Sequence, residues 1–266
     1  MLPLQAFTDA TDARDNPQRL REIARTQGHM LLRGLVPTTL VAKVRRSALQ
    51  HGHELGWLRA TDAAEVRADA ALTGTGYDDP VWLEMQRRML PDADFAALGA
   101  HPALLAVLGH LYEEPASTGR GDICRLAFPN AANQTTPPHQ DHFYVGGSTR
   151  IWTAWMPLTE CPVGLGPLAV WPGSHLEGLR PHAGEGAGRQ GVTPPEHVHW
   201  ASGDLQPGDV VLFHCLTVHR ALANTTNSTL RISVDYRFQP ASEPLDTRRL
   251  DGSMAGDVDG PVDDGS

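Results

Sequence analysis

The chain has few cysteines and no long apolar run, and each of these absences argues against a class of protein. Its three cysteines, Cys124, Cys161 and Cys215, are widely spaced and form no CxxC pair. A disulfide scaffold or a structural zinc site is therefore disfavoured, and a reducing cytoplasm is the expected compartment. We find no apolar run of about 18 residues, so we expect no membrane span. Residues 1–14 contain early acids and no apolar segment, unlike a secretion signal.

Positively charged residues are also scarce, and this argues against some classes of binding partner. Lys43 is the single lysine, and 22 basic residues stand against 31 acidic ones, for a net charge of -9. Nucleic-acid binding usually needs a basic surface, and the Lys and Arg residues form no sizeable cluster in the sequence. We therefore expect no nucleic-acid partner and a small-molecule substrate, and the sequence does not indicate an oligomeric state.

The length and composition favour one domain. The 266 residues are 41% hydrophobic, which is enough for a full core. We expect this domain over residues 1–240, with a helix-rich part at 1–120 and a β-rich part at 121–240. The acidic, apolar-poor tail at 241–266 is expected to be disordered.

Helix signals dominate the first part. Asn16-Pro17 predicts a helix start, with Asn as the N-cap, and Gly28 predicts its end. Further elements are a strand at 29–36, a helix from Pro37 and a loop at 61–79, with two more helices at 81–90 and 102–112.

Strand signals dominate from residue 122. Short apolar runs alternate there with Pro, Gly, Asn and Thr clusters, as in a β-sandwich or barrel. We expect strands at 123–128, 139–145, 150–157, 168–171, 209–214, 217–221 and 230–238. The segment 176–207 is rich in Gly, Pro and His and is predicted to be a long surface insertion of the kind that often covers a site.

His139, Asp141 and His219 are the candidate metal ligands. On a strand, residues i and i+2 point to the same face, so His139 and Asp141 can share one ion. Two histidines and one carboxylate form the facial triad of iron(II) oxygenases, whereas a structural zinc site needs a fourth protein ligand. The alternatives are a surface strand for the H-x-D motif, which 13 histidines make common by chance, and an ordinary core histidine for His219.

Arg231 is the candidate anion-binding residue. It shares one face of an alternating strand with Ser233. The connection 224–228 predicts that this strand pairs with 217–221, which would place Arg231 near His219. A buried arginine needs an anionic partner, and a dicarboxylate would supply one. The alternative is that this polar face is exposed to solvent.

Together these motifs resemble the phytanoyl-CoA dioxygenase family of iron(II)- and 2-oxoglutarate-dependent oxygenases. The resemblance covers residues 120–240 and is carried by His139-Gln140-Asp141, Trp155-Met156-Pro157-Leu158, the run GPLAVWPGSH from Gly166 to His175, Gly208-Asp209, His219 and Arg231-Ile232-Ser233. The family implies a mainly β fold with flanking helices, built on a double-stranded β-helix (jelly-roll, cupin-like) core.

The resemblance also implies the site and its cofactors. His139, Asp141 and His219 would bind Fe(II), with 2-oxoglutarate as cosubstrate and O₂ as the oxidant. Arg231 and Ser233 would bind the cosubstrate, and Gln140 and Trp155 would line its pocket. The tight turn at Pro172–His175 is expected to be structural.

Two positions depart from the family pattern. Ala221 stands where members often have Ser or Thr, two residues after the distal histidine. The family's early-strand lysine has no counterpart, because Lys43 lies in an expected helix, and Arg125 is the candidate replacement.

The resemblance implies hydroxylation of a small-molecule metabolite or natural-product intermediate, with release of succinate and CO₂. Asp141 favours hydroxylation, because related halogenases lack this carboxylate, while desaturation and cyclisation stay open. The substrate is expected near Arg125, His142, Tyr144 and Trp152, with 176–207 as a candidate lid. The alternatives are a cupin-type dioxygenase or isomerase without 2-oxoglutarate, and a catalytically silent jelly-roll binding protein.

Overall fold

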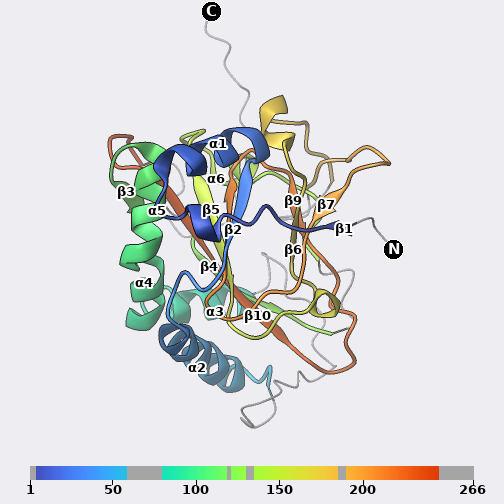
Figure 1. Cartoon of the computed structure of the whole chain (residues 1–266). Helices are drawn as coiled ribbons and strands as arrows, with labels where there is room; N and C mark the ends of the chain where they lie inside the picture. The colour runs from blue at the N-terminus through green and yellow to red at the C-terminus, as the bar shows by residue number, and fades with distance from the viewer. Residues whose placement is uncertain (1–3, 59–79, 119–120, 130–134, 185–189, 246–266) are drawn as a thin grey trace, which may run out of the picture.

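The computed structural model describes residues 4–58, 80–118, 121–129, 135–184 and 190–245. The loop expected at 61–79 and most of the tail expected at 241–266 lie outside these residues. In Figure 1, a layer of helices, a larger sheet and a smaller sheet follow one another from left to right.

Two mostly antiparallel sheets face each other. The larger has the order β2-β8-β5-β10-β3, and β4 also pairs with β10. Its strands are β2 (His29–Leu32), β3 (Ala116–Thr118), β4 (Ile123–Ala127), β5 (Trp152–Pro157), β8 (Val210–His214) and β10 (Arg231–Pro240). The smaller sheet has the order β1-β7-β6-β9, with β1 (Leu4–Gln5), β6 (Leu168–Val170), β7 (Trp200–Ala201) and β9 (His219–Ala221). This sandwich confirms the predicted jelly-roll core with flanking helices, although its sheets do not close into a barrel.

Strand β10 organises the larger sheet. It pairs with β5 on one side and with β4 and β3 on the other, and all ten of its residues are buried. Because side chains alternate along a strand, Ile232, Val234, Tyr236 and Phe238 pack into the core shared with the helices. The intervening polar side chains, Arg231, Ser233, Asp235 and Arg237, therefore lie on the face between the two sheets. The alternative of a solvent-exposed polar face is wrong.

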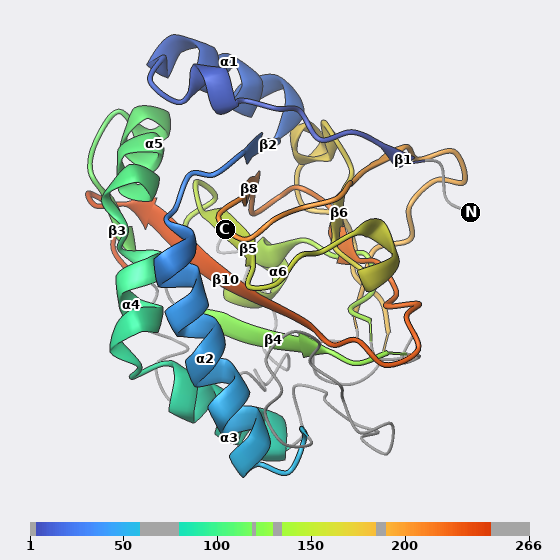
Figure 2. The same cartoon turned by 60° about the horizontal axis from the view of Figure 1, so that its bottom comes forward.

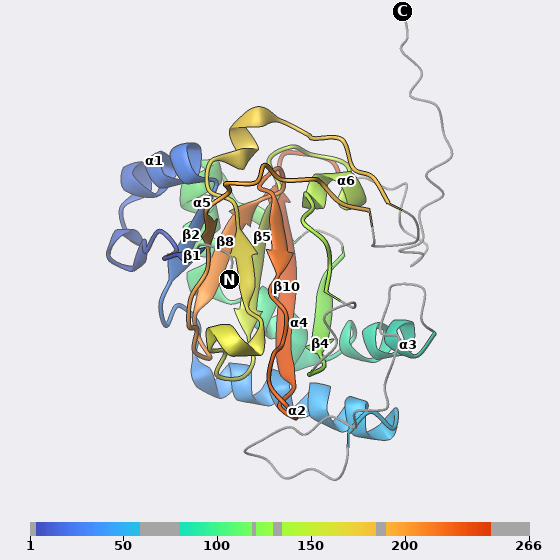
Figure 3. The same cartoon turned by 90° about the vertical axis from the view of Figure 1, so that its right-hand side faces the viewer.

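The helices cover the outer face of the larger sheet. They are α1 (Pro17–Gln27), α2 (Thr38–Glu54), α3 (Pro80–Met89), α4 (Ala93–Gly99) and α5 (Pro102–Tyr112). Figure 2 shows α2, α3 and α4 along the side of β10 and β4, and Figure 3 shows β2, β8, β5, β10 and β4 in this order from left to right. The start of α1 is as predicted, because the Asn16 side chain accepts from the Arg19 amide at 3.1 Å, and Gly28 ends the helix in the left-handed conformation.

Helices α4 and α5 form the one stretch of the described chain that is long and apolar enough to cross a membrane by composition, at 93–112. Pro102 separates the two helices. Phe95, Leu98, Leu104 and Leu108 are buried in the core against β10 and its neighbours. We therefore interpret both as core helices.

Two predictions about strands are wrong. The expected strand at 139–145 is instead a single bridge between His139 and His219 followed by the short helix α6 (Asp141–Val145). The run His142–Val145 has bulky residues at every position and thus no clear period, so tertiary contacts decide: the His142 amide donates to the Cys215 carbonyl at 3.1 Å.

The expected pairing of 217–221 with 230–238 is also wrong. Strand β9 pairs with β6, and β10 pairs with β5, β4 and β3. The reason is topological, because β8, β9 and β10 lie alternately in the larger, the smaller and the larger sheet. The connection 222–230 crosses from one sheet to the other and does not form a hairpin.

Candidate metal centre

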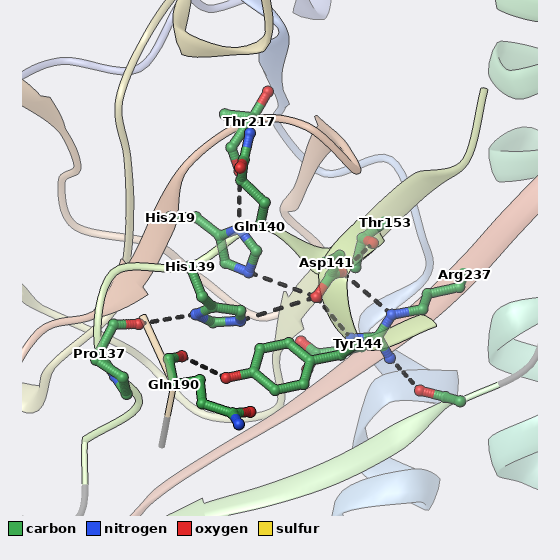
Figure 4. A network of polar contacts seen from close by, with 12 residues as sticks. Pro137, His139, Gln140, Asp141, Tyr144, Thr153, Gln190, Thr217, His219 and Arg237 are labelled. Carbon is green, nitrogen blue, oxygen red and sulfur yellow. Dashed lines mark hydrogen bonds and ion pairs between the residues drawn. The ribbon is translucent and has the colours of Figure 1, made fainter. Parts of the chain in front are cut away.

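The three predicted ligands meet in the interior between the sheets. The Nε2 atoms of His139 and His219 lie 3.8 and 3.6 Å from Oδ1 of Asp141. All three side chains are buried, and their ligand atoms lie within 4.8 Å of one another. Across residues 4–58, 80–118, 121–129, 135–184 and 190–245, this is the one such group of three metal-binding side chains. Figure 4 shows the side chains converging.

The backbone explains the convergence. His139 and His219 exchange two backbone hydrogen bonds of 2.9 Å, so their rings lie side by side with centroids 4.1 Å apart. Gln140 is extended, with φ -118° and ψ 130°. In an extended chain His139 and Asp141 project to the same side, so the sequence argument holds although the segment is not a regular strand.

Both histidines are held with Nε2 free to bind a metal. The Nδ1 atom of His139 lies 2.8 Å from the Pro137 carbonyl, and that of His219 lies 3.0 Å from the Thr217 carbonyl. A carbonyl only accepts, so each Nδ1 carries the proton and each Nε2 presents its lone pair. Burial lowers the pKa of both imidazoles below the ordinary value, which keeps them neutral. Neutral imidazole is the form that binds metal ions.

Asp141 is held as an anion. Burial alone would raise the pKa of this carboxyl, but the Arg237 guanidinium lowers it well below its ordinary range. Arg237 donates from Nη2 to Oδ1 and from Nε to Oδ2, both at 3.1 Å. Thr153 donates its hydroxyl to Oδ2 at 2.6 Å. The carboxylate is thus ionised and fixed in direction.

This donor set fits non-haem iron. Two neutral imidazoles and one carboxylate leave coordination positions open, as iron(II) oxygenases require. A structural zinc site would need a fourth protein ligand, and no fourth His, Cys, Asp or Glu joins the group within the described part of the chain.

Arg231 and Ser233 carry polar atoms without protein partners. Both residues are buried on β10, and within the described part of the chain neither Nε of Arg231 nor Oγ of Ser233 has a hydrogen-bond partner. Among the described residues no carboxylate lies within ion-pair distance of Arg231, although its guanidinium lies 5.8 Å from the centroid of the Trp155 ring. An unpaired buried charge is costly. The two residues therefore fit an anionic molecule bound between the sheets.

Gln140 and Trp155 were expected to line the cosubstrate pocket, and they differ in placement. Trp155 is buried between the sheets and faces Arg231. The side-chain amide of Gln140 instead donates to the carbonyls of Gly178 and Leu216 and accepts from the backbone amide of Arg180. Gln140 is therefore a clamp on neighbouring loops, and its side chain has no hydrogen bond with the triad.

The four expected substrate residues are also spread apart. Tyr144 lies edge-on to the His139 ring at 5.4 Å, and Arg125 pairs with Asp235 at 2.5 Å on the same interior face. His142 is half-buried on α6. Trp152 lies in the core against the helices. Because Thr153 and Trp155 face the interior, strand alternation turns Trp152 away from the triad, and we leave it out of the site.

The insertion expected at 176–207 folds against the metal-binding segment. Its His182 ring accepts a hydrogen bond from the backbone amide of Gln140 at 3.1 Å and stacks on Phe143, with ring centroids 4.1 Å apart. Tyr144 donates its hydroxyl to the Gln190 carbonyl, and the Val192 amide donates to the Pro138 carbonyl at 2.6 Å. The described part of the insertion thus covers the segment that holds His139 and Asp141.

Sequence reasoning did not single out Arg237 and Thr153. Arg237 continues the alternation of Arg231, Ser233 and Asp235, and a further arginine on a buried face requires a carboxylate. That pattern was the available signal. Nothing in the sequence marked Thr153, because its role depends on the pairing of β5 with β10.

The comparisons with known proteins agree with this geometry. Residues 24–233 match the family model of phytanoyl-CoA dioxygenase (PhyH). The chain is 29% identical over 252 residues to a 1-deoxypentalenic acid 11-beta-hydroxylase from Streptomyces arenae, covering 89% of this chain and 86% of that protein.

Two solved structures share the fold. One is the epimerase SnoN in complex with Fe3+, alpha ketoglutarate and nogalamycin RO, with a TM-score of 0.61, 24% identity and coverage of 86% of this chain and 85% of that one. The other is EvdO2 from Micromonospora carbonacea var. aurantiaca complexed with 2-oxoglutarate, with a TM-score of 0.60, 23% identity and coverage of 86% and 93%. With a family match that spans most of its length, this chain belongs to the phytanoyl-CoA dioxygenase family.

Proposed function

We propose that this protein is an iron(II)- and 2-oxoglutarate-dependent oxygenase that hydroxylates a small-molecule natural-product intermediate and releases succinate and CO₂. The observation that carries the proposal is the pairing of two features in one buried interior. His139, Asp141 and His219 converge with free donor atoms, and Arg231 is a buried cation that has no carboxylate partner among the described residues.

Each residue has a defined part in this reaction. His139, His219 and Asp141 would hold iron(II), which together with 2-oxoglutarate and O₂ supplies the oxidant for C–H hydroxylation. Arg231 would bind the distal carboxylate of 2-oxoglutarate, and Ser233 would donate its hydroxyl to the same group. Trp155 packs beside Arg231 and excludes water from this pair, which strengthens the electrostatic attraction.

The relatives support the reaction class and the substrate class. The Streptomyces arenae relative is named as a hydroxylase of 1-deoxypentalenic acid. The SnoN complex contains Fe3+ and alpha ketoglutarate, and the EvdO2 complex contains 2-oxoglutarate. Because SnoN is named an epimerase, the type of reaction that this chain catalyses has to be established by identifying its product. The three cysteines are free and buried, which suits the cytoplasmic location that we propose.

An anaerobic titration tests the proposal. Iron(II) followed by 2-oxoglutarate is expected to produce the weak visible charge-transfer band of the ternary complex, and adding O₂ should release succinate. Absence of the band in the wild-type protein would refute the proposal. A band without succinate would favour a binding protein, and turnover of a substrate without succinate would favour a cupin-type enzyme.

Replacing Arg231 tests the cosubstrate assignment. Leaving one charge of a buried ion pair without its partner costs about 2–5 kcal/mol, so Arg231→Ala is expected to weaken 2-oxoglutarate binding by about 30-fold or more. Arg231→Lys should lose less, because it keeps the charge but not the fork. Arg150→Ala, at an exposed ion pair with Glu243, is the control and should bind 2-oxoglutarate like the wild type. Unchanged affinity in Arg231→Ala would remove Arg231 from the site.

A further inference from the structure

The two oxygens of the Asp141 carboxylate have different surroundings. Oδ1 faces both histidine Nε2 atoms, at 3.8 and 3.6 Å, and receives one hydrogen bond, from Arg237 Nη2. Oδ2 receives two, from Arg237 Nε at 3.1 Å and from the Thr153 hydroxyl at 2.6 Å. Figure 4 shows Arg237 and Thr153 on the side of Asp141 away from His139 and His219.

Arg237 is itself held rigidly. Its Nη1 donates to the Gly121 carbonyl, and its backbone amide donates to Asp122 at 3.0 Å. The side chain is buried between the sheets. A guanidinium fixed at both ends imposes its planar fork on the carboxylate that it contacts.

The orientation of Asp141 matters because a carboxylate can bind a metal through one or both oxygens. Binding through both would fill one of the positions that an iron(II) oxygenase leaves open for cosubstrate and O₂. An oxygen that already accepts two hydrogen bonds, one of them from a cation, is a poor second ligand.

We infer that Arg237 and Thr153 are positioning residues that hold Asp141 as a one-oxygen ligand, with Oδ1 directed to the metal and Oδ2 retained by the protein. This inference rests on the proposed metal site. It assigns neither residue to contact with the metal, the cosubstrate or the substrate. Their effect on the reaction passes through the direction and denticity of Asp141.

A purely structural ion pair is the competing explanation, and the chain contains a matched example. Arg125 and Asp235 form a second Arg–carboxylate pair on the same interior face, with Nε of Arg125 2.5 Å from Oδ2 of Asp235. Neither residue belongs to the triad. Replacing Arg125 by Lys therefore perturbs a similar pair and leaves Asp141 with its own donors.

The test uses Co(II) without cosubstrate or O₂, because its visible absorption reports coordination number and ligand geometry. Arg237→Lys keeps the charge and removes the fork, and Thr153→Val removes the Oδ2 donor with little change of shape. Outer partners of metal ligands typically contribute about 10–100-fold to metal affinity, so we expect Co(II) to bind ~10-fold or more weaker in both variants. We also expect an altered Co(II) spectrum in both, and a wild-type spectrum and affinity in Arg125→Lys.

The outcomes separate this inference from the proposed function. If wild-type protein fails to bind Co(II), the metal site itself is wrong and the inference falls with it. If the wild type binds but Arg237→Lys and Thr153→Val show its spectrum and affinity, the positioning role alone is overturned. An equal change in Arg125→Lys would also overturn it, because the effect would then be general to buried ion pairs. Should Arg237→Lys not fold, Thr153→Val decides alone.

Discussion

Gln140 lies between two metal ligands in the sequence, yet the structure predicts that its loss loosens the insertion and spares the metal centre. Its amide makes three hydrogen bonds of 2.7–2.8 Å to Gly178, Leu216 and Arg180. Gln140→Leu would leave three backbone groups unsatisfied. Two of these groups, on Gly178 and Arg180, belong to the insertion, so at about 1 kcal/mol for each group the contact between the insertion and the metal-binding segment should weaken by about 2 kcal/mol.

Such a loss is expected to appear as local opening. Stability of proteins this size commonly exceeds about 5 kcal/mol, so Gln140→Leu should fold. Amide hydrogen exchange over 178–184 should then be about 30-fold faster, since 1.4 kcal/mol corresponds to a factor of ten. Gln86→Leu is the matched control, because Gln86 is also buried and bonds the backbone of Cys124 through its amide. It should lower global stability without a selective change at 178–184. Weaker 2-oxoglutarate binding with unchanged exchange would refute the clamp and restore Gln140 to the cosubstrate pocket.

Two further predictions concern stability. Gly166 has φ +77°, and an added Cβ would lie 2.4 Å from the Leu222 carbonyl oxygen, whereas Gly164 has its nearest neighbour at 3.7 Å. Gly166→Ala should therefore cost about 2–4 kcal/mol in urea denaturation and Gly164→Ala much less, and equal costs would contradict the reasoning. Burial lowers the pKa of His29 and His214 to about 4, so the stability that each contributes is present above pH 6.5 and is lost as the pH falls toward 4, by about 3 kcal/mol each. Asp122 acts in the opposite direction, because burial raises its pKa to about 6. Its contribution to the stability of the fold increases by about 3 kcal/mol as the pH falls over the same interval. A net loss of about 3 kcal/mol from these three groups is expected for metal-free protein, and denaturation midpoints that rise on acidification would contradict it.

The sequence predicted the fold and the triad because both depend on local patterns. Capping residues such as Asn16 and Gly28 define a helix by themselves, and the i, i+2 relation of His139 and Asp141 holds in any extended segment. The family motifs then fixed the order of the strands along the chain. None of these signals requires knowledge of which strands are neighbours.

The parts that were predicted wrongly depend on pairing across the fold. The hairpin expected between 217–221 and 230–238 did not anticipate that β9 and β10 lie in different sheets. Gln140 was assigned by the family resemblance and Trp152 by its strand near the metal, but Trp152 packs in the core against the helices and the Gln140 side chain bonds neighbouring loops. Arg237 was missed because its partner Asp141 lies 96 residues away in the sequence, so no local pattern connects the two residues.

Three arginines lie between the two sheets, Arg231 and Arg237 on β10 and Arg125 on the neighbouring strand β4, and they differ in their partners. Arg125 pairs with Asp235 at 2.5 Å and Arg237 pairs with Asp141 at 3.1 Å. In the described chain Arg231 has no carboxylate partner, although it is buried as deeply as Arg237. If this polar face served only to stabilise the sheet, all three charges would be compensated, because a buried charge without a partner is destabilising. This difference supports the proposal that Arg231 binds an anion that the described residues do not supply, and a dianion bound there would also offset the charge of the metal.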